Sequence, residues 1–514
     1  MFHTLSRTSM LIICLIATNL NSSPICLLPK SKMHGEQIQN ESILWDGPRV
    51  GKTRSVAVHW VTIGQHKVLK IGKHSRAKSN PPNNCSSMSR FKKLLTKNES
   101  LKSSWIGLIN TNYPPLKPSS TTINNVLILS SKKEFRITIA NCNNASVPGP
   151  DKLSWSHLKI ILKDNECLGI IIHIANAYIE LGYWPLHFKR SMTIVIPKLN
   201  KISYNSPKSF RPIVLLNTVG KLIKKVIGER LQFFMAANNF IYPSQLGGLK
   251  FKSMTDVGIV LTHIIWTGWV NNLLTSTLVF DIVQFFLSLN HCLLTLIMKK
   301  VGFDNHIISF FANYLINRKT NYFWNNFMSP IFNVNIGVGQ GLVFSPILSA
   351  LYLSLFIYIL ENRLKNLKIL ISIISFVDDG LFISQSNSFD ISNSHLFCSY
   401  NILTNLLEKF SLVVEHSKTE IFHFNRSQGA FNPPSLDLSP LGESILCPNN
   451  LWKYLGFIFD IKLTSHQHVD FYANKSISTV KCMKFLGNSN YGINSLQKQL
   501  LYRTCVLPIA LYGF

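Results

Sequence analysis

Two adjacent carboxylates lie inside an apolar, β-branched stretch of the chain. Asp378 and Asp379 occur within residues 374–384, which read "ISFVDDGLFIS". Adjacent side chains point to opposite faces of a strand, but at the tip of a hairpin both can flank one site. Two buried carboxylates repel each other, so such a site needs either a raised pKa or a cation.

Asp281 is the candidate for a third carboxylate. It is the one acidic residue in another apolar stretch, "LVFDIVQFF". Three carboxylates on neighbouring strands could hold two divalent ions about 3.5–4 Å apart, which stabilises the attacking and leaving oxygens in phosphoryl transfer. Turns are rich in Asp, so the Asp378–Asp379 pair alone is also what an ordinary turn would contain.

The charge of the chain favours a polyanionic partner. Its 514 residues include 52 Lys and Arg against 24 Asp and Glu, a net charge of +28. Nucleic acid is the first expectation, an anionic membrane surface the second, and a merely soluble basic surface the alternative. Between Asp46 and Glu99 there is no acidic residue. This basic arm predicts either phosphate contacts or a disordered linker.

Two apolar runs bear on membrane association. Residues 10–20, "MLIICLIATNL", resemble the apolar region of a signal peptide. Residues 345–360, "SPILSALYLSLFIYIL", fall short of the roughly 20 residues that a membrane span needs, so we expect a buried helix there.

The ten cysteines form no CxxC pair and no cluster with zinc-finger spacing, which indicates neither a disulfide framework nor a structural zinc site.

The elements that must position the carboxylates follow from local patterns. Helical periodicity begins near Glu134 and is interrupted by the turn at 148–150. We expect a helix over 221–234, a strand–turn–helix over 333–360, and helices after 461. Strands or hairpins are expected at 192–198, 275–283, 369–384 and 452–461. Helices mixed with a small antiparallel sheet predict an α+β fold.

A series of motifs in fixed order carries a family resemblance over residues 131–514. In chain order the motifs are "SVPGPDKLSWSHLKII", "WPLHFKRSMTIVIPK", "SFRPIVLLNTVGKLIKKVIGERL", "PSQLGGLKFKSMTDV", "LVFDIVQFFLSLNH", "NIGVGQGLVFSPIL", "SFVDDGLFIS", "EHSKTEIFHF" and "KYLGFIFD". The series resembles the reverse transcriptase of non-LTR (LINE-type) retrotransposons. Group II intron maturases share the palm but are less similar in "SFRPIVLLN" and "KYLGF".

The resemblance implies a right-hand polymerase that copies RNA into DNA. Its parts would be a basic, poorly patterned region at 1–130, fingers at 131–270, a palm with the small antiparallel sheet at 271–460, and a partial thumb at 461–514. The expected partners are an RNA template, a DNA primer and dNTPs. The family implies a nuclear or cytoplasmic location, with the signal-like residues 10–20 incidental.

Catalytic roles carry over by position. Asp281, Asp378 and Asp379 match the aspartates that bind two magnesium ions, or manganese in their place. The carbonyl of Phe280 or Ile282 could assist them, and the sequence leaves open which. Lys418 resembles the acid that protonates the leaving pyrophosphate, with a solvated loop lysine as the alternative.

Nucleotide-binding roles carry over in the same way. Phe286 matches the aromatic beneath the incoming sugar, with an ordinary core Phe as the alternative. Gln340 matches the residue that touches nucleotide and template, and by itself it would be an ordinary turn Gln. Lys198 and Arg211 match cations that grip the triphosphate, with surface solvation as the alternative.

Three positions depart from the family pattern. Leu287 replaces an acid, Gly339 a proline and Leu342 a serine. Residues 1–130 are too short and too poor in acids for the endonuclease that the family commonly carries. We therefore expect a truncated or decayed copy.

The alternatives to a working polymerase are a catalytically inactive basic RNA-binding protein with the same palm fold, and a membrane-associated protein.

Overall fold

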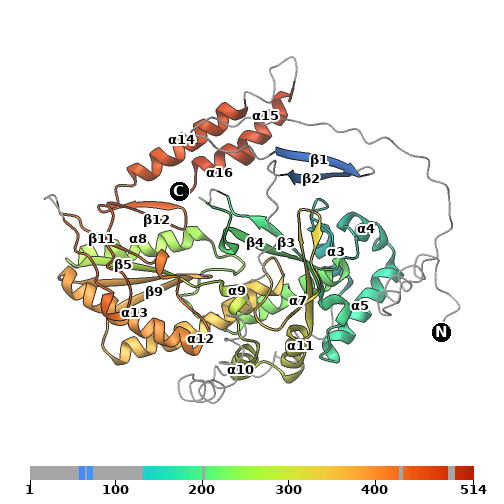
Figure 1. Ribbon diagram of the computed structural model, residues 1–514, viewed down its shortest axis with the longest axis horizontal. Coiled ribbons are helices and arrows are strands. Elements are labelled where there is room, and N and C mark those ends of the chain that lie inside the picture. The colour runs from blue at the N-terminus through green and yellow to red at the C-terminus, as the bar shows by residue number, and fades with distance from the viewer. Residues whose placement is uncertain are drawn as a thin grey trace. The chain divides into compact units, whose positions relative to one another are not determined.

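The computed structural model describes two early strands by their backbone and most of the chain beyond residue 130 (Figure 1). The described ranges are 57–63, 66–72, 131–199, 203–427, 432–483 and 492–513. They fall into two compact units. The first contains the early strands with 131–223 and 316–335, and the second contains 224–315 and 336–513. This division does not test the domain boundaries expected at 130, 270 and 460, which stay predictions.

The early strands, β1 (Ala57–Ile63) and β2 (His66–Gly72), pair antiparallel. They lie in the region for which no regular structure was expected. The signal-like residues 10–20 and most of the basic arm lie outside the described residues.

The first unit combines helices with a five-stranded mixed sheet. Its strand order is β4-β3-β6-β7, with β8 also paired to β6, and β3 runs parallel to β6. The elements are α3 (Lys132–Ala140), α4 (Trp155–Ile161), α5 (Asn165–Glu180), α6 (Leu186–Lys189), β3 (Arg190–Pro197), β4 (Phe210–Leu215), the first turns of α7 (Thr218–Ala237), β6 (Arg318–Trp324), β7 (Phe327–Met328) and β8 (Phe332–Val334).

The turn at 148–150 fixes the start of α7. A Cβ on Gly149 would lie 2.0 Å from the carbonyl oxygen of Leu216, so only glycine allows this approach. Oδ2 of Asp151 then accepts a hydrogen bond from the N–H of Thr218 (2.8 Å), the first residue of α7. The "PGPD" segment therefore caps a helix that is distant in sequence.

The second unit is built around a four-stranded antiparallel sheet with the order β11-β5-β10-β9. Its elements are α8 (Met254–Val270), β5 (Leu274–Asp281), α9 (Phe285–Ser288), α10 (His291–Val301), α11 (Asn305–Leu315), α12 (Phe344–Asn366), β9 (Ile371–Phe376), β10 (Asp379–Ser386), α13 (Phe389–Lys409), β11 (Glu420–Phe424), β12 (Leu451–Tyr454), β13 (Phe457–Asp460), α14 (His466–Met483), α15 (Ser495–Leu501) and α16 (Leu507–Ala510).

The sheet of the second unit is covered on both faces. Helices α12 and α13 contact one face, while α8 and the β12–β13 hairpin pack on the other (Figure 1). Alternate residues of the strands, such as Val279, Leu381 and Phe422, belong to the core beneath α8. Burying each such side chain contributes roughly 1.5–3 kcal/mol. This packing fixes the register that places the ends of β5 and β10 opposite each other.

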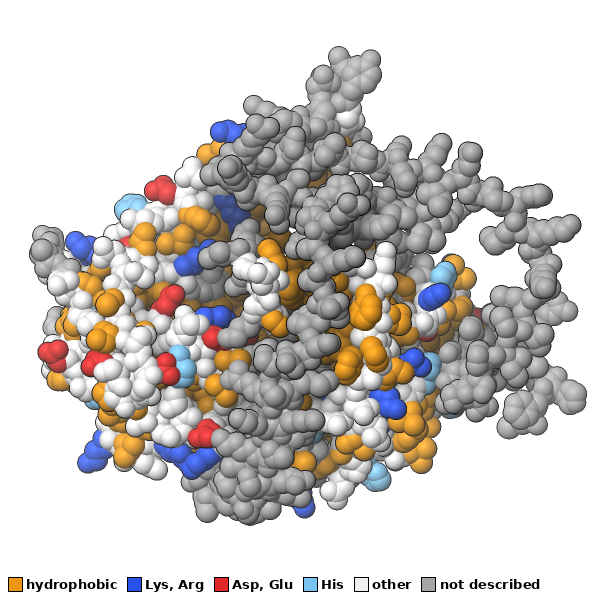
Figure 2. All heavy atoms as spheres, viewed as in Figure 1, with side chains coloured by type: hydrophobic (Ala, Val, Ile, Leu, Met, Phe, Trp, Pro, Cys, Tyr) orange, Lys and Arg blue, Asp and Glu red, His pale blue; other side chains and the backbone are white. Residues whose placement is uncertain are grey.

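The expected α+β architecture is confirmed, and so is the buried helix at 345–360. That segment lies in α12, and 83% of the most apolar 18-residue stretch of this helix is buried. Among the described residues, α12 is the one helix whose length and composition would suffice to cross a membrane. On the face seen in Figure 2, the described Lys and Arg side chains are scattered among apolar and polar ones.

Candidate active site

The three predicted carboxylates meet at one end of the four-stranded sheet. Asp281 is the last residue of β5 and lies directly opposite Asp379, the first residue of β10. Asp378 lies in the two-residue turn between β9 and β10, and its carbonyl oxygen accepts a hydrogen bond from the N–H of Ile282 (3.2 Å). By strand alternation, Asp281 lies on the same face of the sheet as Val279, beneath α8.

Burial and mutual repulsion raise the pKa of two of these acids. Burial is the largest cause for Asp379, and with the charges of Asp378 and Asp281 it raises the pKa of Asp379 to about 7. The protonated Asp379 carboxyl also donates a hydrogen bond to Asp281. Burial, with a smaller effect of Asp281, raises the pKa of Asp378. Full ionisation of the group therefore requires added positive charge.

Lys418 supplies one such charge. It ends the short 3₁₀ turn η3 (His416–Lys418), and its Nζ lies 2.5 Å from Oδ2 of Asp281. Burial disfavours the ammonium form, but the hydrogen bond to Asp281 and the three carboxylates outweigh it, so the pKa of Lys418 is raised. The Lys418 side chain is 61% exposed and that of Asp281 only 10%, so the lysine reaches the acids from the solvent side. A purely solvated loop lysine would not make this contact.

The turn that carries Lys418 is anchored at its other end. Nε2 of His416 lies 3.0 Å from Oε1 of Glu443, and the buried Tyr400 hydroxyl is hydrogen-bonded to Nδ1 of the same ring. A ring held on both sides leaves the turn little freedom. The position of the lysine therefore depends on contacts well removed from the carboxylates in sequence.

Phe286 and Gln340 lie on two segments that are hydrogen-bonded to each other. The carbonyl oxygen of Phe286 accepts from the N–H of Val338 (2.6 Å), two residues before Gln340. Phe285 is buried, whereas Phe286 and Gln340 are half-buried. The core position of this aromatic pair is thus Phe285. The partial exposure of Phe286 is what a side chain that faces a ligand requires.

Lys198 and Arg211 belong to the first unit. Arg211 lies opposite Ile196 in the β3–β4 pair, and the N–H of Lys198 bonds to the carbonyl oxygen of Ser209 (2.8 Å). Because side chains alternate along strands, the side chains of Lys198 and Arg211 lie on the same face of the β3–β4 pair. Arg211 is exposed and Lys198 half-buried. The structure places Lys198 and Arg211 on one strand pair of the first unit. In the second unit it brings Asp281, Asp378, Asp379 and Lys418 together, and it places Phe286 and Gln340 on neighbouring segments.

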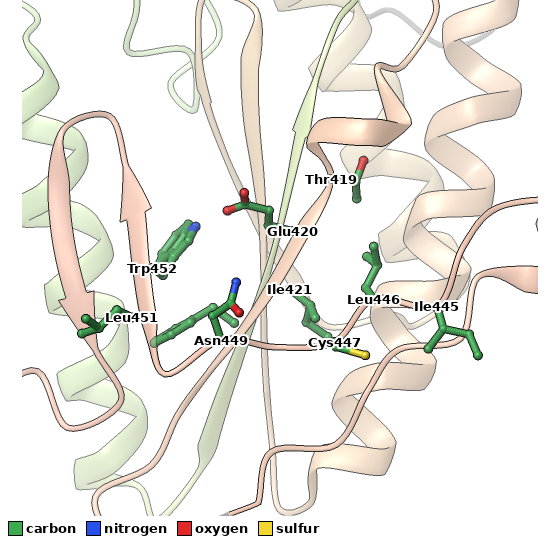
Figure 3. A pocket seen from close by; sticks show the side chains of 10 residues that line it. Thr419, Glu420, Ile421, Ile445, Leu446, Cys447, Asn449, Leu451 and Trp452 are labelled. Atoms are coloured by element: carbon green, nitrogen blue, oxygen red, sulfur yellow. The ribbon is translucent and has the colours of Figure 1, made fainter. Parts of the chain in front are cut away.

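A small pocket of about 110 Å³ opens between β11 and the segment that leads into β12. Figure 3 shows the side chains of Glu420 and Asn449 directed into this space, with Trp452 on its β12 side. The aspartates are not part of its lining. The predicted chemistry therefore belongs to the open end of the sheet and not to this pocket.

A comparison with known families decides what kind of protein carries this arrangement. The family model described as "Reverse transcriptase (RNA-dependent DNA polymerase)" matches residues 196–487, more than half of the chain. The chain belongs to the reverse transcriptase family. All eight predicted site residues, from Lys198 to Lys418, lie within the matched range.

Curated relatives narrow the resemblance to mobile elements. The chain is 25% identical over 378 residues to the "Probable RNA-directed DNA polymerase from transposon BS" of Drosophila melanogaster, covering 71% of this chain and 40% of the relative. It is 23% identical over 381 residues to the corresponding polymerase from transposon X-element of the same species, covering 74% and 40%. The predicted resemblance to retrotransposon reverse transcriptases is confirmed. The chain spans about 40% of the length of these relatives.

An apo telomerase from Candida tropicalis, truncated from its C-terminal domain, aligns with 54% of this chain and 54% of its own, at 14% sequence identity and a TM-score of 0.37.

The donor set of this reverse transcriptase suits a hard divalent cation. Carboxylate oxygens are the protein ligands that magnesium and manganese prefer. Burial raises the pKa of Asp378 and Asp379 in spite of the nearby Lys418 charge, so a cation bound there would stabilise their ionised forms. Across the described residues, no three His, Cys, Asp or Glu side chains converge as a ready-made metal site. Asp281 instead contacts Lys418 and is hydrogen-bonded to Asp379.

Tyr454 is a residue of this reverse transcriptase that sequence interpretation did not assign. It lies in β12 and is 4% exposed, and within the described part of the chain its hydroxyl has no hydrogen-bond partner. Burial, with a smaller effect of the Asp379 charge, raises the pKa of Tyr454. Its place in "KYLGF" was the only sequence signal. That motif does not reveal proximity to an aspartate 75 positions earlier in the chain.

Proposed function

We propose that this protein catalyses RNA-templated DNA synthesis. The 3′-hydroxyl of a DNA primer attacks the α-phosphate of a dNTP, a new phosphodiester bond forms, and pyrophosphate leaves. The observation that carries the proposal is the pairing of Asp281 with Asp379 across β5 and β10, with Asp378 in the adjoining turn. By the same family resemblance we propose a nuclear or cytoplasmic location.

Asp281, Asp378 and Asp379 would hold the divalent ions. Bound there, such ions would supply the positive charge that lowers the pKa of the primer hydroxyl and neutralises the leaving pyrophosphate. The aspartates lie at the end of a packed sheet, where the register of β5 and β10 sets the separation between Asp281 and Asp379. Rigid support of this kind is what in-line attack on a phosphate requires.

The remaining residues have distinct proposed tasks. Phe286 would contact the sugar and exclude a 2′-hydroxyl, and Gln340 would contact the nucleotide beside it. Lys418 carries its proton on Nζ at the open end of the site, where the ammonium can donate that proton to departing pyrophosphate. Lys198 and Arg211 would contact the triphosphate.

Primer extension tests the proposal. Purified protein is given a poly(A) template, an oligo(dT) primer, dTTP and Mg²⁺, and we expect the primer to lengthen. Asp281→Asn and Asp378→Asn should abolish extension while RNA affinity stays within about twofold, because binding rests on distributed phosphate contacts. Asp470→Asn, on the exposed surface of α14, is the matched control and should extend normally.

The outcomes separate the two classes of function. Extension by Asp281→Asn at the wild-type rate would refute the assignment of the acids. If the wild-type protein shifts the template in a gel but never lengthens the primer, it is the inactive RNA-binding protein instead.

A further inference from the structure

The segment Tyr242–Gly248 is held firmly against α12. The N–H of Tyr242 donates to Oγ of Ser354 (3.0 Å), and its hydroxyl donates to Oε2 of Glu361 (2.7 Å). Oγ of Ser244 donates to the other oxygen of the same carboxylate (2.8 Å). Both oxygens of Glu361 are thus used to fix the first three residues of the segment.

The next residues add a short partner to the edge strand β9. The N–H of Leu246 donates to the carbonyl oxygen of Ser375, and the N–H of Ser375 donates to that of Ser244, each at 2.8 Å. Gln245 lies beside Ser375 in a parallel bridge. The segment thereby runs along β9 to the turn that carries Asp378.

At that turn, the segment makes hydrogen bonds through the side chain of Gln245 and no longer through its backbone. It is 1% exposed, and its Oε1 accepts from the N–H of Gly247 (3.0 Å) and, more weakly, from the N–H of Val377 (3.4 Å). Both neighbours are donors, which fixes the orientation of the amide with its oxygen toward them. Nε2 then has no hydrogen-bond partner among the described residues. This is an unfavourable arrangement that the packing of the turn enforces.

The turn itself is strained. Val377 has φ = +61°, in the left-handed region that a β-branched residue rarely adopts. Gly247 lies against it so closely that a Cβ there would be 2.3 Å from the nitrogen of Val377 and 2.7 Å from the carbonyl carbon of Phe376. A strained conformation of this kind persists only where its surroundings over-determine it.

We infer that Tyr242–Gly248 is a brace that fixes the Val377–Asp378 turn, and that Gln245 is a positioning residue for Asp378 and Asp379. The catalytic part of this inference rests on the proposed function. The structural part does not, because it concerns the conformation of the turn in the protein alone. An ordinary packing role for Gln245 would affect global stability without a selective effect on this turn.

The test uses Gln245→Met, which keeps the length of the side chain and removes the acceptor. Gln385→Met is the matched control. Gln385 lies near the far end of β10, where its Nε2 donates to the carbonyl oxygen of Ile264 (2.7 Å). A second pair is Gly247→Ala, which would press on the turn, and Gly169→Ala, whose added Cβ would meet nothing within 4 Å.

Hydrogen–deuterium exchange without divalent ions reports on the turn directly. Gln245→Met and Gly247→Ala should speed exchange in a peptide covering 374–384 by about tenfold or more. The first variant removes the hydrogen-bond acceptor of the Val377 N–H, and the second displaces the backbone that packs against it. The controls should leave this peptide unchanged. Exchange at the wild-type rate in both turn variants would overturn the brace.

Primer extension then tests the catalytic consequence. We expect kcat to fall about 10–100-fold in Gln245→Met and Gly247→Ala, with the KM for dTTP and the RNA affinity within about threefold, because misplacing a catalytic group mainly affects the chemical step. If kcat fell equally in Gln385→Met, Gln245 would have only an ordinary packing role. If the wild-type protein extends no primer, the proposed function fails, while the exchange experiment still decides whether the brace exists.

Discussion

Replacing Asp379 by Asn should stabilise the protein in the absence of divalent ions. Burial, Asp378 and Asp281 raise the pKa of Asp379 to about 7, against an ordinary value of 3.8. An Asp379→Asn side chain has nearly the same shape as the protonated acid and can still donate a hydrogen bond to Asp281. The substitution thus removes a charge that the folded state disfavours and keeps the contact that it favours.

The size of the effect follows from linkage. A carboxyl whose pKa is raised by folding contributes stability that is present below its unfolded pKa and is lost as the pH rises through its folded pKa. The shift of about three pH units, at about 1.4 kcal/mol each, corresponds to on the order of 4 kcal/mol at pH 8. At pH 5 Asp379 is already protonated in the folded state, so the advantage of Asn falls to less than half of its value at pH 8.

Urea unfolding of both proteins in EDTA, at pH 5 and pH 8, measures this difference. Asp470→Asn controls for the loss of an exposed carboxylate and should change stability by less than about 0.5 kcal/mol at either pH. Adding Mg²⁺ at pH 8 should stabilise the wild type and have less effect on Asp379→Asn. A variant no more stable than wild type at pH 8, or a gain that does not change with pH, would refute the account of the site as a group of uncompensated charges.

Three further predictions concern residues around the site and in the basic arm. Phe286→Val should admit ribonucleotides with little loss of dNTP use, measured by primer extension with each nucleotide; unchanged discrimination would show that the side chain is not the barrier. Tyr454→Phe should unfold at the same or a higher urea concentration because its hydroxyl is buried without a described partner, and a loss above about 1 kcal/mol would reveal one. Deleting 46–99 should flatten the dependence of log RNA affinity on log salt, and an identical slope would make the arm a linker.

Much of the second unit could be predicted because its signals are local. The β9–β10 hairpin is two β-branched runs joined at a short turn, and its tip is where Asp378 and Asp379 were expected. Strand β5 has the same composition around Asp281. A strand can be recognised from its own residues when both its faces are buried and its ends carry turn signals.

The contacts that complete the site join distant segments, so no local pattern predicted them, and Lys418 was expected at the site only from the family resemblance. Lys418 meets Asp281 across 137 positions, and Gln245 meets Val377 across 132. In the first unit, β3 pairs in parallel with β6, a strand that was not expected. Such pairings depend on which surfaces the folded chain brings together, and neither periodicity nor composition of a single segment encodes them.

Several unfavourable features of the second unit lie together at one end of its four-stranded sheet. The acids with raised pKa values, the left-handed Val377 and the Nε2 of Gln245 that has no described partner all belong to the β9–β10 turn and its support, whereas the strands behind them are packed from both faces. Strain of this kind is retained where function requires it and the scaffold can support it. The two sorts of substitution should therefore differ. Removing a repelling charge at Asp379 should raise stability while activity is lost, whereas removing the support at Gln245 should lower the rate of catalysis and the protection of the turn together.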